Sequence, residues 1–212
     1  MALRYLAIDG PIGLGKTVLA ERLGARLEAT IVRDERENPF LAGFYAGQTG
    51  AAFQAQLFFT LARHRQLTQL RQANLFSQTT VCDYVFERDR IYAFMNLDDN
   101  ELFIYQRLFD LVSRDVPVPD LVVFLQTPTE LLKRRLRERV KRHDEDDPLP
   151  TEEYVTELNE AYNHYFFHYS ATPLLVVETS QLDLTWGEQT IDDLLKQLRS
   201  MGSGTRYYVP RT

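Results

Sequence analysis

The chain has 212 residues, a net charge of −6 and a sequence pI near 5.3. This length suffices for a buried core, so we expect a single domain over residues 1–212. The acidic charge argues against a nucleic-acid-binding protein, which would need a broad basic surface, and favours a small ligand.

The cysteine count and the hydropathy pattern bear on the compartment. Cys82 is the only cysteine, which excludes an internal disulfide and is typical of a reducing compartment. No apolar stretch approaches the roughly 20 residues that cross a bilayer, and a strand pattern begins where a signal peptide would lie. We therefore expect a cytoplasmic protein without a membrane partner.

Strand and helix patterns alternate along the chain. In order, they predict a strand at 4–10, a helix at 16–29, a strand at 30–35, a turn opening into a helix at 38–47, a helix at 51–73, a strand at 80–86, a helix at 99–113, a strand at 119–128, helices at 129–142 and 151–169, a strand at 173–180 and a helix at 190–201. The sequence of the tail, 202–212, is compatible with either a flexible segment or one docked on the rest of the protein. The alternation predicts a three-layer α/β fold, in which a five-stranded parallel sheet flanked by helices binds ligands at the carboxyl ends of its strands.

The loop after the first strand carries the most specific motif. It reads GPIGLGKT and matches G-x-x-x-x-G-K-[ST] between a predicted strand and a predicted helix. In such a loop, backbone N–H groups surround phosphates, the lysine reaches the outer phosphates and the threonine hydroxyl can ligate Mg²⁺. The predicted ATP-binding residues of the loop are Gly10, Pro11, Ile12, Gly13, Leu14, Gly15, Lys16 and Thr17.

A basic helix separates a kinase from other nucleotide-binding proteins. The run RRLRERVKR, 134–142, follows the fourth predicted strand, and a charged turn extends it to about 148. Positive charge there would stabilise a transferring phosphoryl group, and a closing lid would exclude water. Guanine-binding and switch motifs of GTPases do not occur in the sequence. The combination favours a P-loop kinase fold with a basic lid over 134–148, ahead of an ATP-driven switch.

Several segments together resemble one family. The chain carries the glycine loop and then the segments RENPFLAGFY, FQAQLFFTLARHRQ, CDYVFERD and LLKRRLRERVKR. In their order and spacing, these segments resemble those of the deoxyribonucleoside kinases, particularly the bacterial deoxyadenosine and deoxyguanosine kinases. The resemblance runs from the first strand to EEYVTELNEAYNHYF. It implies that ATP with Mg²⁺ phosphorylates the 5′-hydroxyl of a deoxynucleoside, preferably a purine one. It further implies a homodimer formed through helices, although some relatives pair unlike chains.

The resemblance assigns the nucleoside pocket. It places Gln56 and Arg63 over the nucleobase, with Asp89 joining Arg63, and Tyr45 beside the sugar. Gln56 can serve either purine, since its amide offers both a donor and an acceptor. An acid in the turn, Asp144 or Glu145, falls where a contact with the sugar 3′-hydroxyl is expected, or lies in a solvated acidic turn.

The catalytic acid and the phosphate-binding groups follow from the same resemblance. A general base is expected at the end of the second strand, where ungapped register from Lys16 favours Asp34 and residue type favours Glu35. Asp83 is the expected second ligand of Mg²⁺, beside Thr17. Tyr84 stands where many relatives carry arginine, and Arg88 either supplies that charge or pairs with Glu87 or Asp89. The lid residues expected to grip phosphate are Arg135, Arg139 and Lys141.

Two alternatives remain at this stage. A nucleoside monophosphate kinase would share the loop and the lid but would need arginines for the phosphate of its acceptor, which Gln56 and Asp89 do not provide. A regulatory subunit of a heteromeric deoxynucleoside kinase would be expected to lack Lys16 or the acids at 34–37, and this chain retains them.

Overall fold

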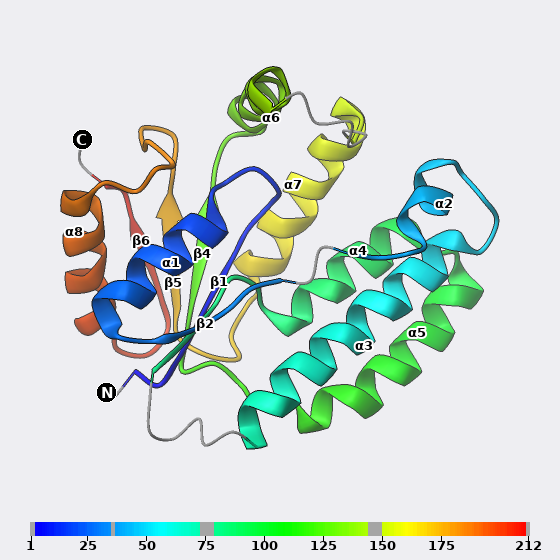
Figure 1. Ribbon diagram of the computed structural model, residues 1–212, viewed down its shortest axis with the longest axis horizontal. Coiled ribbons are helices and arrows are strands. Elements are labelled where there is room, and N and C mark those ends of the chain that lie inside the picture. Colours follow the sequence, from blue (N-terminus) through cyan, green and yellow to red (C-terminus); the bar gives the residue numbers. More distant parts are fainter. Residues whose placement is uncertain (1–2, 35–36, 73–78, 144–149, 211–212) are drawn as a thin grey trace. The chain divides into compact units, whose positions relative to one another are not determined.

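The computed structural model describes residues 3–34, 37–72, 79–143 and 150–210, with side chains omitted at 71–72 and 140–143 (Figure 1). The chain forms two compact units. The sheet unit comprises the described residues of 1–33, 78–85 and 119–212, and the helical unit those of 34–77 and 86–118.

The described residues of the sheet unit form one parallel sheet of six strands in the order β2-β3-β1-β4-β5-β6. Its elements are β1 (Tyr5–Asp9), α1 (Lys16–Leu27), β2 (Thr30–Val32), β3 (Thr80–Cys82), β4 (Leu121–Gln126), α6 (Thr129–His143), α7 (Glu152–Phe167), β5 (Leu174–Glu178), α8 (Glu188–Arg199) and β6 (Thr205–Tyr208). The predicted α/β fold with helices flanking a parallel sheet is confirmed. The expected strand count of five is wrong, because part of the tail pairs with β5 as β6.

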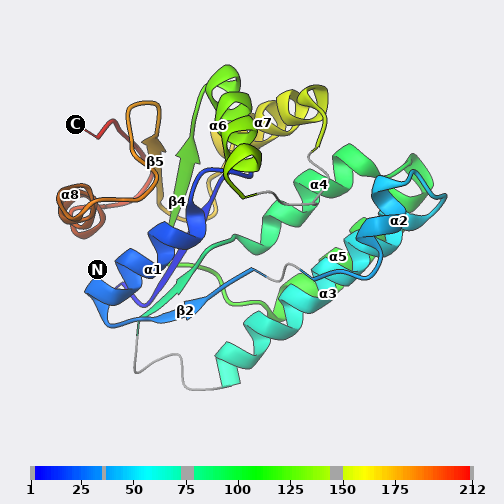
Figure 2. The same ribbon diagram turned by 45° about the horizontal axis from the view of Figure 1, so that its top comes forward.

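Alternating side chains along the strands bury both faces of the sheet. In β4, Val123 and Leu125 face the cluster formed with α1 and α8. Phe124 points to the other face, where it stacks on Phe166 of α7 with ring centroids 4.2 Å apart. Because successive strand residues point to opposite faces, one apolar run supplies both layers. Figure 2 shows α1 and α7 on opposite sides of the strands.

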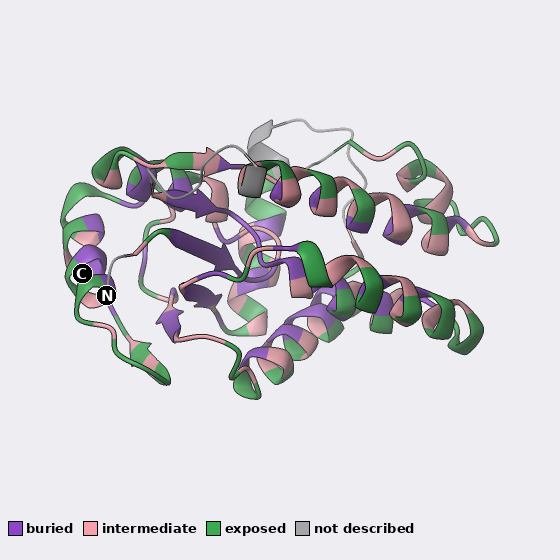
Figure 3. Ribbon diagram, turned by 90° about the horizontal axis from the view of Figure 1, so that it is seen from below, coloured by how far each residue is buried: buried purple, intermediate pink, exposed green. Residues whose placement is uncertain are grey.

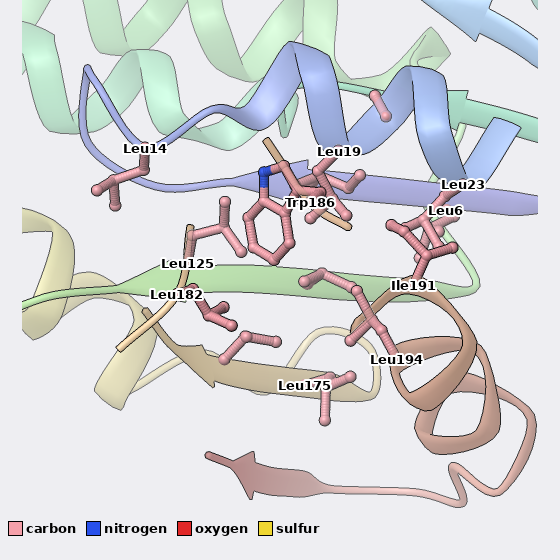
Figure 4. Packing of buried hydrophobic residues seen from close by; sticks show 14 of the residues in the cluster. Leu6, Leu14, Leu19, Leu23, Leu125, Leu175, Leu182, Trp186, Ile191 and Leu194 are labelled. Atoms are coloured by element: carbon pink, nitrogen blue, oxygen red, sulfur yellow. The ribbon is translucent and has the colours of Figure 1, made fainter. Parts of the chain in front are cut away.

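The main core lies between α1, α8 and the strands. Leu19 and Leu23 of α1 meet Ile191 and Leu194 of α8 over the leucines of the sheet, and Trp186 is buried among them (Figure 4). Burying each such side chain is worth roughly 1.5–3 kcal/mol. This core fixes the position of α1, and therefore of the loop that precedes it.

The helical unit packs its helices on each other. Its elements are α2 (Leu41–Tyr45), α3 (Ala51–Gln72), the 3₁₀ turn η1 (Phe86–Arg88), α4 (Asp89–Asn96), α5 (Asp99–Val112) and the 3₁₀ turn η2 (Ser113–Asp115). A capping box between Asp98 and Glu101 starts α5. Phe86 stacks on Phe109 of α5, with ring centroids 5.0 Å apart. Figure 3 shows buried and exposed residues alternating along these helices, as expected for amphipathic packing.

The structure differs from the predicted elements at two places along residues 80–96. The predicted strand at 80–86 ends at Cys82, and residues 89–96, for which no element was predicted, form α4. The chain leaves the sheet at this point because Val85 donates its N–H to the Asp9 carboxylate instead of extending the ladder. Among the described residues, no helix is both long and apolar enough to cross a membrane.

Candidate active site

The glycine loop between β1 and α1 curves tightly because its backbone enters conformations that favour glycine. Gly13 and Gly15 have φ of +88° and +68°. A Cβ on Gly13 would lie 2.7 Å from Leu136 Cδ2 of α6, and one on Gly10 would lie 2.7 Å from the Leu125 carbonyl oxygen of β4. Glycine is therefore required both by backbone angle and by close packing.

Lys16 and Thr17 begin α1 with their polar groups gathered at the loop. The Lys16 ammonium donates hydrogen bonds to the carbonyl oxygens of Gly10 and Pro11, at 2.7 and 2.9 Å. These contacts hold the charge over the curve of the loop. The N-terminus of α1 adds partial positive charge at the same place, so the loop is suited to bind phosphate groups.

Thr17 also contacts the next strand of the sheet. Its hydroxyl donates to the Asp83 carboxylate at 2.6 Å. β1 and β3 are parallel neighbours, so the loop after β1 and Asp83 after β3 meet at one edge of the sheet. A hydroxyl and a carboxylate oxygen in contact fit Mg²⁺, which prefers hard oxygen ligands and completes its shell with water and phosphate oxygens. The described residues contain no cluster of three His, Cys, Asp or Glu side chains suited to a metal.

Two residues that sequence reasoning missed hold this loop. Asp9 is buried at the end of β1, where its carboxylate accepts from the backbone N–H of Gly10 and from that of Val85, at 2.7 and 2.9 Å. The Trp186 indole N–H donates to the Gly15 carbonyl oxygen at 3.1 Å. An acid inside the apolar run YLAID was the available signal for Asp9. Nothing local marks Trp186, because its contact joins residues far apart in the sequence.

The described part of the basic lid is the helix α6. Arg135 donates to the Thr179 hydroxyl and to the carbonyl oxygens of Thr179 and Leu182, at 3.1, 2.6 and 3.1 Å. Burial and the neighbouring charge of Arg134 lower the pKa of Arg135. Arg139 is exposed on the same helix. Lys141 belongs to α6, but its side chain lies outside the described residues, as do Asp144 and Glu145.

In the helical unit, the predicted base-binding residues come together. Gln56 and Arg63 lie two turns apart on α3, and both contact Asp89 at the start of α4. The Gln56 amide nitrogen donates to the Asp89 carbonyl oxygen at 3.0 Å. A carbonyl oxygen only accepts, so this contact fixes which end of the amide is the nitrogen. Arg63 donates to the Asp89 carboxylate, which is fully buried.

Asp34 joins the same cluster. Its carboxylate accepts from Arg63 Nε at 2.7 Å and Nη2 at 3.3 Å, and also from Arg88 Nη2. Arg88 therefore pairs with Asp34. Burial opposes ionisation of Asp34, but the charges of Arg88 and Arg63 outweigh it and lower the pKa of Asp34 to about 2. Burial raises the pKa of Asp89 in spite of its contact with Arg63.

The remaining predicted residues are less informative. Tyr84 is fully buried in the sheet unit, directly after Asp83. Tyr45 ends α2 and is about half exposed, and its ring lies 5.3 Å from that of Phe44. Glu35, the alternative general base, lies outside the described residues. The roles assigned to all these side chains stay predictions.

The fold and the loop define a P-loop nucleotide-binding protein of the α/β class. The defining features are the parallel sheet, the glycine loop at its edge and the side chains of Lys16, Thr17 and Asp83. Within that class the family is specific: the model of the deoxynucleoside kinases matches residues 6–201, and the chain belongs to this family. The resemblance inferred from the sequence is confirmed, and the protein is a deoxynucleoside kinase.

Individual relatives agree with this assignment. The chain is 29% identical over 137 residues to deoxyguanosine kinase of Bacillus subtilis, covering 64% of this chain and 66% of the relative. It is 24% identical over 211 residues to deoxyadenosine kinase of Lactobacillus acidophilus, covering 92% and 95%. Deoxyadenosine kinase from M. mycoides, solved with dCMP and a flexible dCDP as products, has a similar fold, with a TM-score of 0.75 at 24% identity over 93% of this chain and all of that one.

Proposed function

We propose that the protein uses ATP to phosphorylate the 5′-hydroxyl of a deoxyribonucleoside, with a purine deoxynucleoside as its preferred substrate, in deoxynucleotide salvage. The glycine loop with Lys16 and the Thr17–Asp83 contact supplies the observation that carries this proposal. The cluster of Gln56, Arg63 and Asp89 supports a planar, hydrogen-bonding acceptor such as a nucleobase. The bacterial relatives described above are a deoxyguanosine kinase and a deoxyadenosine kinase, which favours purines.

In this proposal, the residues of the chain act mainly by positioning and charge. The backbone of the loop and the N-terminus of α1 hold the β- and γ-phosphates, and the Lys16 ammonium moves from the Gly10 and Pro11 carbonyl oxygens to the phosphates. Arg135 and Arg139 on α6 neutralise the charge that develops on the transferring group. An acid at the end of the second strand, Asp34 or Glu35, accepts the proton from the attacking hydroxyl.

Thr17 and Asp83 would hold Mg²⁺ in the same site. When bound, the ion would supply positive charge that neutralises charge developing on the phosphate groups. We expect Asp83→Asn to raise the Mg²⁺ concentration that gives half-maximal turnover, because a carboxylate ligand is lost. A titration of turnover with Mg²⁺ at fixed ATP measures this, and an unchanged midpoint would remove Asp83 from the metal site.

The test of the proposed reaction is a coupled ADP-release assay with deoxyadenosine, deoxyguanosine, deoxycytidine, thymidine and dAMP as acceptors. Release stimulated by the purine deoxynucleosides supports the full proposal, and stimulation by the pyrimidines instead corrects the substrate. Stimulation by dAMP alone would favour the nucleoside monophosphate kinase, which the family match does not favour. ADP release without any acceptor would favour an ATP-driven switch.

We also propose that the protein is a homodimer in the cytoplasm. One face of α5 supports the dimer, because it exposes Phe103, Ile104 and Leu111, each by more than half. Large apolar side chains grouped on one helix face commonly mark an interface between proteins. Cys82 is buried and carries a thiol, which is compatible with a reducing compartment.

A further inference from the structure

The carboxylate of Asp34 is shared between two arginines of the helical unit. Arg63 donates to both of its oxygens, at 2.7 and 3.3 Å, and Arg88 donates to Oδ2. The two arginine side chains are about 5% exposed, whereas the Asp34 side chain is 21% exposed. Asp34 therefore links α3, which carries Arg63, to η1, which carries Arg88.

Asp34 supplies negative charge to this cluster. It pairs with both Arg63 and Arg88, and Arg63 also pairs with Asp89. Without Asp34, Arg63 and Arg88 would each lose a carboxylate partner, and a partner lost from a buried pair leaves charge uncompensated. Arg63 would then lose the contact that fixes its Nε edge, while its Nη1 edge stays on Asp89.

A general base has different requirements. It needs a carboxylate oxygen directed at the hydroxyl proton and a pKa near the working pH. Both oxygens of Asp34 already accept from guanidinium groups, and the positive charges hold its pKa far below the neutral range. Its surroundings are those of a structural anion.

From this geometry we infer that Asp34 is a positioning residue, which holds Arg63 and Arg88 in place for nucleoside binding, and that the proton of the 5′-hydroxyl is accepted by another group. The inference rests on the proposed function, since it concerns residues that the proposed function assigns to nucleoside binding. It decides against Asp34 between the two candidates for the general base that the sequence leaves open, Asp34 and Glu35.

The test uses the whole protein with Asp34→Asn, and Asp99→Asn as a matched control at an exposed position of α5. Loss of positioning predicts that the deoxynucleoside KM rises about tenfold or more while kcat changes by less than about threefold. The pH dependence of kcat keeps its acidic limb, because the group that titrates is still present. A fall of kcat by about 100-fold at unchanged KM, with loss of that limb, would overturn the inference.

Calorimetric titration with deoxyadenosine and deoxyguanosine in the absence of ATP separates this inference from the proposed function. A wild-type protein that binds no nucleoside and shows no nucleoside-stimulated ADP release refutes the proposed function itself. If the wild type binds and turns over, binding weakened about tenfold in Asp34→Asn supports the positioning role, and unchanged binding contradicts it.

Two further variants keep the inference testable if Asp34→Asn does not fold. Asp34→Glu keeps the charge but lengthens the side chain, so a positioning role predicts a raised KM with kcat retained, whereas a base would lose kcat as its oxygen is displaced. Arg88→Met combined with Asp34→Asn removes the uncompensated charge. We expect this pair to recover part of the binding lost in Asp34→Asn, and additive losses would argue against the coupling of the two residues.

Discussion

At the scale of single residues, Lys16 is the side chain whose loss should affect turnover most selectively. Lys16→Met removes the ammonium group from the loop while keeping a chain of similar length. We expect kcat/KM for ATP to fall by about 100-fold or more, because charge on the transferring phosphoryl group is no longer neutralised. Steady-state kinetics measures this, with Lys196→Met, an exposed lysine of α8, as the control. Equal losses in both variants would contradict the role of Lys16.

Asp34 gives a second prediction at this scale, because its pKa is lowered from 3.8 to about 2 in the folded protein. A lowered acid pKa contributes stability that is present above the unfolded value and is lost as the pH falls through the folded one. The shift corresponds to about 2 kcal/mol. The difference in unfolding free energy between wild type and Asp34→Asn should therefore shrink by about that amount between about pH 5 and pH 2.

Denaturant unfolding at several pH values measures this difference. Subtracting the variant from the wild type removes the contributions of acids that do not interact with Asp34. A difference that stays constant across this range would show that Asp34 is not held as an anion by Arg63 and Arg88.

At the scale of elements, β6 completes the sheet from a segment that sequence patterns left open. It pairs with β5 in parallel register, from Leu174 with Thr205 to Val177 with Tyr208. We expect truncation after Met201 to lower the melting temperature and to promote aggregation, because the apolar strand β5 would become an unprotected edge. Thermal unfolding and light scattering test this. An unchanged melting temperature without aggregation would show that β6 contributes little to the sheet.

The same element shows where sequence patterns stop being informative. The glycine loop and α3 could be predicted because a local motif and apolar spacing specify them. β6 is short and has no fully buried residue, so no apolar run marks it as a strand in the sequence. Likewise, Asp34 with Arg88 and Trp186 with Gly15 are contacts between distant residues, and no local pattern encodes them. The Arg63–Asp89 contact was expected only because a family resemblance supplied it.

At the scale of the whole molecule, the proposed dimer gives a prediction on the face of α5. Leu111→Glu places a charge among the exposed apolar side chains there, so we expect it to convert a dimer into monomers at micromolar concentration. Sedimentation velocity measures the change. Phe167→Glu, at an exposed position of α7, is the control. Dissociation by the control but not by Leu111→Glu would place the interface elsewhere, and a monomeric wild type would refute the dimer.

The hydrogen bond from Trp186 to Gly15 has an optical consequence. Trp186 is the single tryptophan of the chain, so all indole emission arises from a fully buried ring that touches the phosphate loop. With excitation at the red edge of the absorption band, the emission maximum of the protein without ATP should therefore lie at short wavelength. The emission intensity should change when ATP is added. Such a change, absent from Trp186→Phe, would make the native protein its own fluorescent reporter of nucleotide occupancy.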